Sequence, residues 1–257
     1  MKTTLFAFAF VVALSLAAMA ANPNKPAPSL HRAGDPSQAE VKGFDSHTPN
    51  PPALCHPCLF YGGDLNPSAI NAAGMSDENT LLIPNSSTYG SIDIPTGVTA
   101  NVWGIVFNVQ ADAAFDPLLA TYDVRTGVSE GNGGTSIASG TGTAVVAATG
   151  RNFIGLNEYT VAVTWSTPVA VTAGEYWFNI TPQCLNTLDG SCSVFRQFVS
   201  NTTSLTNNLR GSWQPAHEMF LNSPAFGLTW ANWCDASVAG FNQIQCGRMS
   251  FGVIGHE

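Results

Sequence analysis

The stretch "VTANVWGIVFNVQ", residues 98–110, carries the clearest strand signal in this sequence. Successive side chains of a β-strand point to opposite faces of its sheet, so residues two positions apart share a face. One face holds Val102, Gly104, Val106 and Asn108, and the other holds Trp103, Ile105, Phe107 and Val109. β-branched and aromatic residues dominate the stretch, as they do in strands generally. The pattern therefore predicts a β-strand.

The same signal recurs on both sides of this stretch. Apolar runs alternate with turn residues such as Gly, Asn and Pro, at intervals of roughly 8–15 residues. Further strands are predicted at 79–83, 91–94, 118–127, 159–165, 168–180, 194–200 and 247–255, with a hairpin at 131–146, a turn at 172–175 and a short helix at 66–74. About ten short strands separated by turns predict an all-β fold. We expect a single-domain antiparallel β-sandwich of jelly-roll type over residues 55–257, stapled by disulfides.

The first twenty residues have the parts of a secretory signal peptide. Lys2 precedes an apolar run that is short for a membrane anchor, and Ala18-Met19-Ala20 forms a cleavage signal. Residues 21–54 contain many prolines and no apolar periodicity, which is typical of a flexible arm. The mature chain is therefore expected to be secreted, extracellular or periplasmic, with no membrane insertion after signal cleavage. A formal net charge of −8 without a basic patch excludes nucleic acid as a partner.

Six cysteines in an exported chain predict disulfide bonds. They are Cys55, Cys58, Cys184, Cys192, Cys234 and Cys246. The local spacing suggests the pairs Cys184–Cys192 and Cys234–Cys246, each of which closes a short loop.

Cys55-His56-Pro57-Cys58 has the C-x-x-C spacing of thioredoxin-type redox sites. That chemistry requires a helix at the first cysteine, where the helix dipole lowers the thiol pKa. Here Pro-rich residues precede the motif, and "LFYGGD" after it predicts a strand and a turn. We therefore expect a structural disulfide. A zinc site is the other alternative, but it lacks a second close pair of ligands.

Three motifs together resemble a known group of proteins. They are "LFYGGD" at 59–64, "TPVAVTAGEYWFNI" at 167–180 and "CGRMSFGVIGHE" at 246–257. The chain resembles a loosely defined group of exported bacterial β-sandwich proteins to which no activity is attached. The resemblance implies that residues 251–255 form the last strand of the sandwich. Many members carry a Pro-Glu-Pro sorting tail, which this sequence lacks, so surface anchoring is not expected.

Carboxylates suggest two further kinds of site. Asp112, Asp116 and Asp123 are close in sequence, but their spacing fits no known calcium loop, and Asp116 before a proline is typical of a turn. A hydrolase would need two carboxylates in one cleft. Candidates are Asp93, Glu158, Glu175 and Glu218, the last beside His217. No G-x-S-x-G, H-E-x-x-H or P-loop motif is present. We expect no metal, no cofactor and no catalytic residues.

Tryptophans cluster in the loop-like segment 211–234, "GSWQPAHEMFLNSPAFGLTWANWC". Aromatic rings stack on the apolar faces of sugars, while amide side chains hydrogen-bond to hydroxyls. The predicted ligand-binding residues are Trp213, Gln214, Trp230, Asn232 and Trp233. In the alternative interpretation these indoles plug the open end of the sandwich, because Trp is usually mostly buried.

These observations favour an exported, non-catalytic extracellular binding or adhesion module whose partner is a polysaccharide or cell-surface glycan. One alternative is a structural envelope or matrix protein whose sheet edges make the contacts. The other is a secreted hydrolase that uses Glu218 and a second acid. Glycosylation sequons occur at Asn85, Asn179 and Asn201, of which Asn179, inside a predicted strand, is the least suited to modification.

Overall fold

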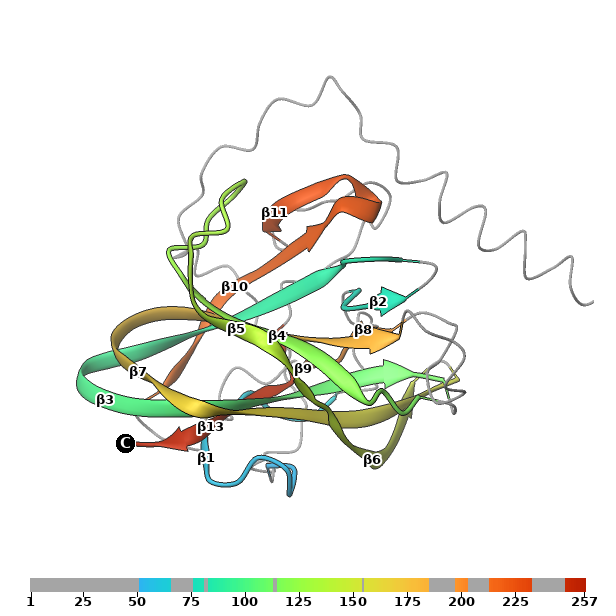
Figure 1. Ribbon diagram of the computed structural model, residues 1–257, viewed down its shortest axis with the longest axis horizontal. Helices are drawn as coiled ribbons and strands as arrows, with labels where there is room; N and C mark the ends of the chain where they lie inside the picture. Colours follow the sequence, from blue (N-terminus) through green and yellow to red (C-terminus); the bar gives the residue numbers. More distant parts are fainter. Residues whose placement is uncertain are drawn as a thin grey trace, which may run out of the picture.

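The computed structural model describes residues 51–65, 76–80, 83–112, 115–153, 155–184, 197–202, 213–232 and 248–257. This part of the chain is all-β, as predicted, with one turn of 3-10 helix at Pro224–Phe226 and no α-helix (Figure 1). The strands are β1 (Cys58–Tyr61), β2 (Asn79–Thr80), β3 (Ser87–Ala111), β4 (Leu119–Thr126), β5 (Thr135–Thr143), β6 (Val145–Phe153), β7 (Leu156–Cys184), β8 (Phe198–Val199), β9 (Asn201–Thr202), β10 (Gln214–Ser223), β11 (Leu228–Asn232), β12 (Arg248–Met249) and β13 (Phe251–His256).

Two long strands, β3 and β7, form an antiparallel ribbon at the centre of the fold. The strand predicted at 98–110 is confirmed as the second half of β3. Register shifts interrupt the ribbon between Ile94 and Thr99 and again between Val102 and Gly104. Extra residues on one strand of a pair bend the ribbon. Figure 1 shows the result, a ribbon that curls round so that the two halves of β3 lie in different layers.

The turn predicted at 172–175 is wrong. Thr172 and Gly174 both pair with β3 inside the continuous strand β7, so the chain bends here without reversing. Gly174 has a φ of 145°, which side chains disfavour. Glycine therefore marks a bend in this strand, and the two strands predicted at 159–165 and 168–180 are one.

In the described part of the chain, eleven strands belong to one connected sheet, whose main path runs β1-β13-β3-β7-β4-β5. β10 pairs with the first half of β3, and β13 pairs with the second half. β6 and β4 likewise pair with opposite halves of β7. All pairings in this sheet are antiparallel except β2–β7, which is parallel. β9 and β12 form a separate pair.

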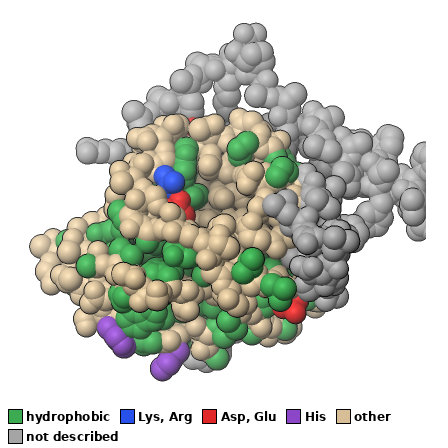
Figure 2. Space-filling model, viewed as in Figure 1, with side chains coloured by type: hydrophobic (Ala, Val, Ile, Leu, Met, Phe, Trp, Pro, Cys, Tyr) green, Lys and Arg blue, Asp and Glu red, His purple; other side chains and the backbone are tan. Residues whose placement is uncertain are grey.

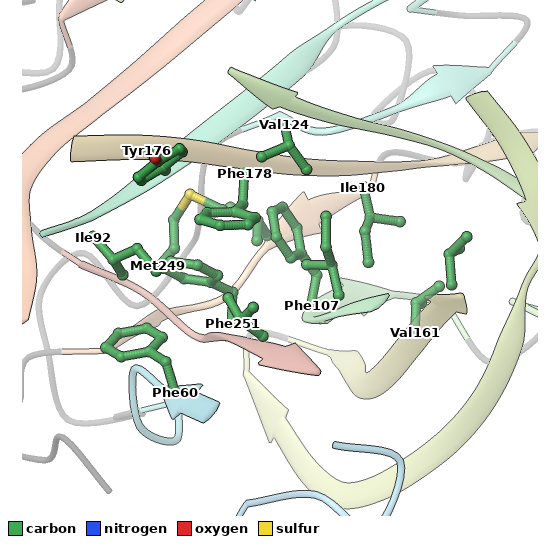
Figure 3. Packing of buried hydrophobic residues seen from close by; sticks show 14 of the residues in the cluster. Phe60, Ile92, Phe107, Val124, Val161, Tyr176, Phe178, Ile180, Met249 and Phe251 are labelled. Atoms are coloured by element: carbon green, nitrogen blue, oxygen red, sulfur yellow. The ribbon is translucent and has the colours of Figure 1, made fainter. Parts of the chain in front are cut away.

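The two halves of the bent sheet face each other across an apolar core (Figure 3). The ring of Phe251 in β13 lies 5.8 Å from that of Phe107 in the neighbouring strand β3. It also lies 6.1 Å from the ring of Phe178, which is in the second half of β7. Phe107 and Phe178 are fully buried. Each such side chain contributes roughly 1.5–3 kcal/mol to stability, so the core holds the folded-over sheet together.

The Cys55-His56-Pro57-Cys58 motif forms the predicted staple, with a disulfide between Cys55 and Cys58. Strand β1 begins at Cys58, so no helix follows to activate a thiol. Cys184 is also disulfide-bonded. Cys192, Cys234 and Cys246 lie outside the described residues, and so do their pairings.

Several other predictions fall mostly or wholly outside the described residues: the signal peptide, most of the arm and the helix at 66–74. The last residue of the arm, Leu54, packs against the cluster of Cys55, Val106 and Ile254. In the part of the chain that is described, no helix has the length and apolar character needed to cross a membrane.

Candidate functional site

A groove lies over neighbouring strands of the sheet and has polar residues along its floor. Asp123 of β4 pairs with Ser139 of β5 on one side and with Asn179 of β7 on the other. Residues directly opposite each other point to the same face, so the three side chains form a row. Thr121 and Thr141 begin a second row beside it. The groove has a volume of about 340 Å³ and is lined by Ser87, Tyr89, Thr121, Tyr122, Asp123, Ser139, Gly140, Thr141 and Asn179.

Asp123 is the hub of the polar contacts in this groove. Its Oδ2 accepts hydrogen bonds from the Tyr89 hydroxyl, at 2.9 Å, and from the Arg125 Nε. Its Oδ1 accepts a hydrogen bond from the Ser136 hydroxyl at 2.6 Å. Arg125 in turn donates through Nη1 to the carbonyl of Gly133 at 2.8 Å. The carboxylate is thus neutralised by a guanidinium that is itself held in place.

The protonation of the neighbouring groups follows from this pairing. Burial raises the pKa of Tyr89, and the charge of Asp123 raises it further. Burial alone would lower the pKa of Arg125, but the hydrogen bond and charge of Asp123 outweigh it and raise the pKa. Tyr89 therefore stays neutral and Arg125 stays charged at neutral pH, so Asp123 and Arg125 together contribute no net charge. Figure 2 shows how sparse charged side chains are on one face of the molecule, which is mostly hydrophobic and uncharged.

Trp230 of β11 lies next to this groove. Its ring packs on Tyr89 with centroids 4.7 Å apart, and the Arg125 guanidinium lies 4.9 Å from its ring centroid. Gly133 leaves room for the indole, because a Cβ there would come within 2.4 Å of the ring. Trp230 is half-buried and has a φ of 46°, a strained conformation for a bulky residue. Such strain persists only where the surroundings impose it, and it concentrates at functional sites.

The floor of the groove rests on a buried carboxylate, Asp77. Its Oδ1 accepts hydrogen bonds from Asn179 Nδ2 at 3.0 Å, Thr181 Oγ1 at 2.9 Å and the Thr88 backbone N–H at 3.1 Å. Asp77 is fully buried, and its Oδ2 has no hydrogen-bond partner among the described residues. Burial is the main cause that raises the pKa of Asp77 to about 8, with Glu78 adding to it and the hydrogen bonds opposing it.

A second polar cluster joins β1 and β3 to Ser250, which lies between β12 and β13. Asn108 Nδ2 donates to the Tyr61 hydroxyl and to the Ser250 hydroxyl, each at 2.7 Å. The Tyr61 hydroxyl donates to Asp64 at 2.7 Å. Burial, and then the charge of Asp64, raises the pKa of Tyr61. These groups satisfy one another, so the cluster stabilises the junction of these strands.

Arg151 extends this second cluster and pairs with two carboxylates. It lies 3.2 Å from Asp64 Oδ1 and also bonds to Oε2 of the fully buried Glu158. Both acids are thus paired with one guanidinium, and neither of them lines the groove.

The residues of the tryptophan prediction lie in different surroundings. Trp213 is fully buried in the core, and its Nε1 donates to Glu257 at 3.0 Å. An indole without exposed surface cannot stack on a ligand, so assigning Trp213 to the site is wrong, and the alternative role as a plug fits it. Trp230 and Asn232 are half-buried in β11. The side chain of Gln214 and the whole of Trp233 lie outside the described residues.

The other carboxylates do not gather at the groove. Asp93 and Glu175 pair with each other across β3 and β7, and neither lines the groove. The side chain of Glu218 lies outside the described residues. Within the described ranges, no group of three or more His, Cys, Asp and Glu residues is arranged to hold a metal ion, so Asp123 is not joined by Asp112 and Asp116.

Tyr89, Asp123, Ser139 and Asn179 were not predicted from the sequence as members of one site. Asp123, Ser139 and Asn179 are at least 16 residues apart in sequence and are brought together only by strand pairing, and Tyr89 reaches Asp123 through its hydroxyl. A signal was present, because polar residues recur at every second position of predicted strands, as in Thr121 and Asp123. Polar residues with that period mark a polar face of a sheet.

No protein-family model matches this chain, and no curated protein is significantly similar to it in sequence. The resemblance to exported β-sandwich proteins therefore stays a prediction.

Proposed function

We propose that this protein is an exported, non-catalytic carbohydrate-binding module and that the groove over β5, β4, β7 and β3 holds the sugar. The observation that carries the proposal is the chemistry of the lining. Hydroxyls, an amide, a carboxylate and a phenol line the floor, and a strained tryptophan stands beside them. Sugar hydroxyls need donors and acceptors of this kind, and the ring of a sugar needs an aromatic platform.

The ligand we propose is a neutral polysaccharide segment. Asp123 is paired with Arg125, so the described residues that line the groove offer an anionic sugar no free cation and a cationic sugar no free anion. The volume of about 340 Å³ lies at the lower end of the range for ligand sites, which suits one or two sugar rings of a longer chain.

The number of carboxylates in the groove favours sugar binding over sugar hydrolysis. Among the described residues that line the groove, Asp123 is the only carboxylate. Most glycosidases need two, one of which must accept or donate a proton. Asp123 is also paired with Arg125, and its oxygens can accept hydrogen bonds from sugar hydroxyls.

Export and the finer fold belong to the same proposal. The N-terminal segment has the parts of a signal peptide, and the Cys55–Cys58 disulfide suits an oxidising compartment. A bent antiparallel sheet folded over one core is compatible with a jelly-roll sandwich, which we propose as the topology.

The test is a pull-down of the mature protein with a panel of insoluble polysaccharides. The variants are Trp230→Ala, which removes the platform, and Trp103→Ala, a matched control. Trp103 is also half-buried but contacts His256, away from the groove. We expect Trp230→Ala to lose at least tenfold in affinity while Trp103→Ala binds like the wild type. No binding to any polysaccharide, or equal loss in both variants, would contradict the proposal.

A further inference from the structure

Most polar side chains that line the groove have already committed the protons that they could donate. A hydroxyl has one such proton, and a side-chain amide nitrogen has two. Asn179 Nδ2 donates one proton to Asp77 Oδ1 at 3.0 Å and the other to the Thr88 carbonyl at 2.8 Å. Neither acceptor lines the groove. The amide of Asn179 therefore has no proton left to offer a ligand.

Tyr89 and Thr121 have committed their hydroxyl protons in the same way. The Tyr89 hydroxyl donates to Asp123 Oδ2 at 2.9 Å. Thr121 Oγ1 accepts from Gln183 Nε2 at 3.2 Å and donates to the Thr181 carbonyl at 3.4 Å. Asp123 acts as an acceptor in each of its hydrogen bonds. These three lining side chains can thus offer a ligand only lone pairs.

The proton of Ser87 is directed by its neighbour Thr181. Their hydroxyl oxygens lie 3.1 Å apart, a distance that allows either one to donate. Thr181 Oγ1 also lies 2.9 Å from Asp77 Oδ1 and 3.1 Å from Asn179 Oδ1. The amide oxygen of Asn179 carries no proton, and Asp77 Oδ1 already accepts from Asn179 and from the Thr88 backbone. Thr181 must donate to one of these two oxygens, because otherwise lone pairs would face each other at hydrogen-bond distance. Towards Ser87 it can then only accept, so Ser87 donates inward.

From these observations we infer that the groove recognises its ligand by the free hydroxyl groups that the ligand donates. Five lining residues of β3, β4 and β7 offer lone pairs only, and we call them the acceptor wall: Ser87, Tyr89, Thr121, Asp123 and Asn179. A sugar hydroxyl can donate to this wall. The oxygen of an ether, an ester or a sulfate cannot, and it leaves the acceptors unpaired, which costs binding free energy. The inference rests on the proposed function and narrows its ligand to a neutral polysaccharide with unsubstituted hydroxyls.

The other side of the groove differs from the acceptor wall. The remaining polar side chains of the lining are Tyr122, Ser139 and Thr141. Ser139 and Thr141 are exposed on β5, so their hydroxyls can rotate to donate or to accept. The ring and glycosidic oxygens of a sugar, which only accept, therefore find donors on this side. Thr181 does not line the groove, and it acts as a positioning residue that turns the Ser87 proton away from the ligand.

The first test compares free with blocked hydroxyls. Soluble fragments of cellulose, xylan and mannan are titrated into the mature protein before and after exhaustive O-methylation, and tryptophan fluorescence reports binding. We expect the wild type to bind a free form at least tenfold more tightly than its methylated form. Thr181→Val releases the Ser87 proton to the groove, so this ratio should fall severalfold. Thr160→Val should keep the wild-type ratio, because Thr160 is also a buried threonine of β7 that donates to an amide oxygen, but it does not contact the groove. The bulk of the methyl groups is the same for all three proteins, so a changed ratio reports the proton.

The second test needs no ligand. Neutron diffraction from crystals of the ligand-free protein in heavy water locates the deuteron between Ser87 and Thr181, and we expect it on Ser87. A deuteron on Thr181 that points to Ser87 overturns the inference, and so does an equal ratio in Thr181→Val and the wild type. Equal binding of free and methylated fragments overturns the inference alone. A protein that binds neither form of any fragment overturns the proposed function and this inference together.

Discussion

Replacing Asp77 by Asn should remove a large pH dependence from the stability of this protein. The folded-state pKa of Asp77 is about 8, against an ordinary value of 3.8. Between about pH 4 and pH 8 the folded state therefore holds a proton that the unfolded state releases. The unfolding free energy falls as pH rises through this window, by up to about 1.4 kcal/mol per pH unit. From pH 5 to pH 7 the loss from this group alone is about 3 kcal/mol.

Asn is the right substitution because it resembles the protonated acid. Its Oδ1 can keep the hydrogen bonds from Asn179, Thr181 and the Thr88 backbone. Its amide nitrogen takes the place of Oδ2, which has no partner among the described residues. Asp77→Asn should exceed the wild type in stability by only about 1–2 kcal/mol at pH 5 and by about 5 kcal/mol at pH 8.

The measurement is denaturant unfolding at pH 5, 6, 7 and 8, followed by tryptophan fluorescence. Asp93→Asn is the matched control, because Asp93 is an exposed carboxylate on β3. The difference in unfolding free energy between wild type and control should stay flat with pH, and the difference for Asp77→Asn should grow. Parallel profiles for Asp77→Asn and wild type would refute the argument that burial keeps this acid protonated.

Three further substitutions test the packing. Gly133→Ala places a Cβ 2.4 Å from the Trp230 ring, so it should cost about 1–3 kcal/mol and shift the tryptophan fluorescence. Cys55→Ser opens the short disulfide loop and should lower the unfolding free energy by about 2 kcal/mol, from the chain entropy that the disulfide removes. The denaturation midpoint should fall accordingly, and reductant should no longer act on it through this disulfide. Phe107→Ala empties a fully buried site and should cost about 3–5 kcal/mol in the same unfolding assay, whereas Ser139→Ala, on the exposed edge, should change it little.

The sequence predicted the class of the fold because strand alternation is a local property. Residues 98–110 and 118–127 show it plainly, and both fall in strands, β3 and β4. The bend at Thr172 to Gly174 could not be recognised in the same way. A glycine with positive φ serves a chain reversal and a bend equally well, and only the pairing with β3 distinguishes them.

The groove escaped prediction because its residues meet only through pairing between strands distant in sequence. Asp123 and Asn179 are 56 positions apart and lie side by side in the sheet. Trp213 and Trp230 looked alike in sequence, because both stand among loop-forming residues. Their burial differs because the Trp213 ring enters the main core, while the Trp230 ring packs against Tyr89 in a separate, smaller cluster. Tertiary packing decides this difference.

Asn179 sets a limit on the hosts that can produce this protein. It heads an N-x-T sequon, yet its Nδ2 donates to both Asp77 and the Thr88 carbonyl and is 2% exposed. An oligosaccharyltransferase would attach its glycan to that same nitrogen as the nascent chain emerges. A glycosylated Asn179 can no longer make both bonds. In a secretory pathway that glycosylates sequons, β7 must therefore fold before Asn179 is modified. Production in a bacterial periplasm avoids this competition between folding and glycosylation.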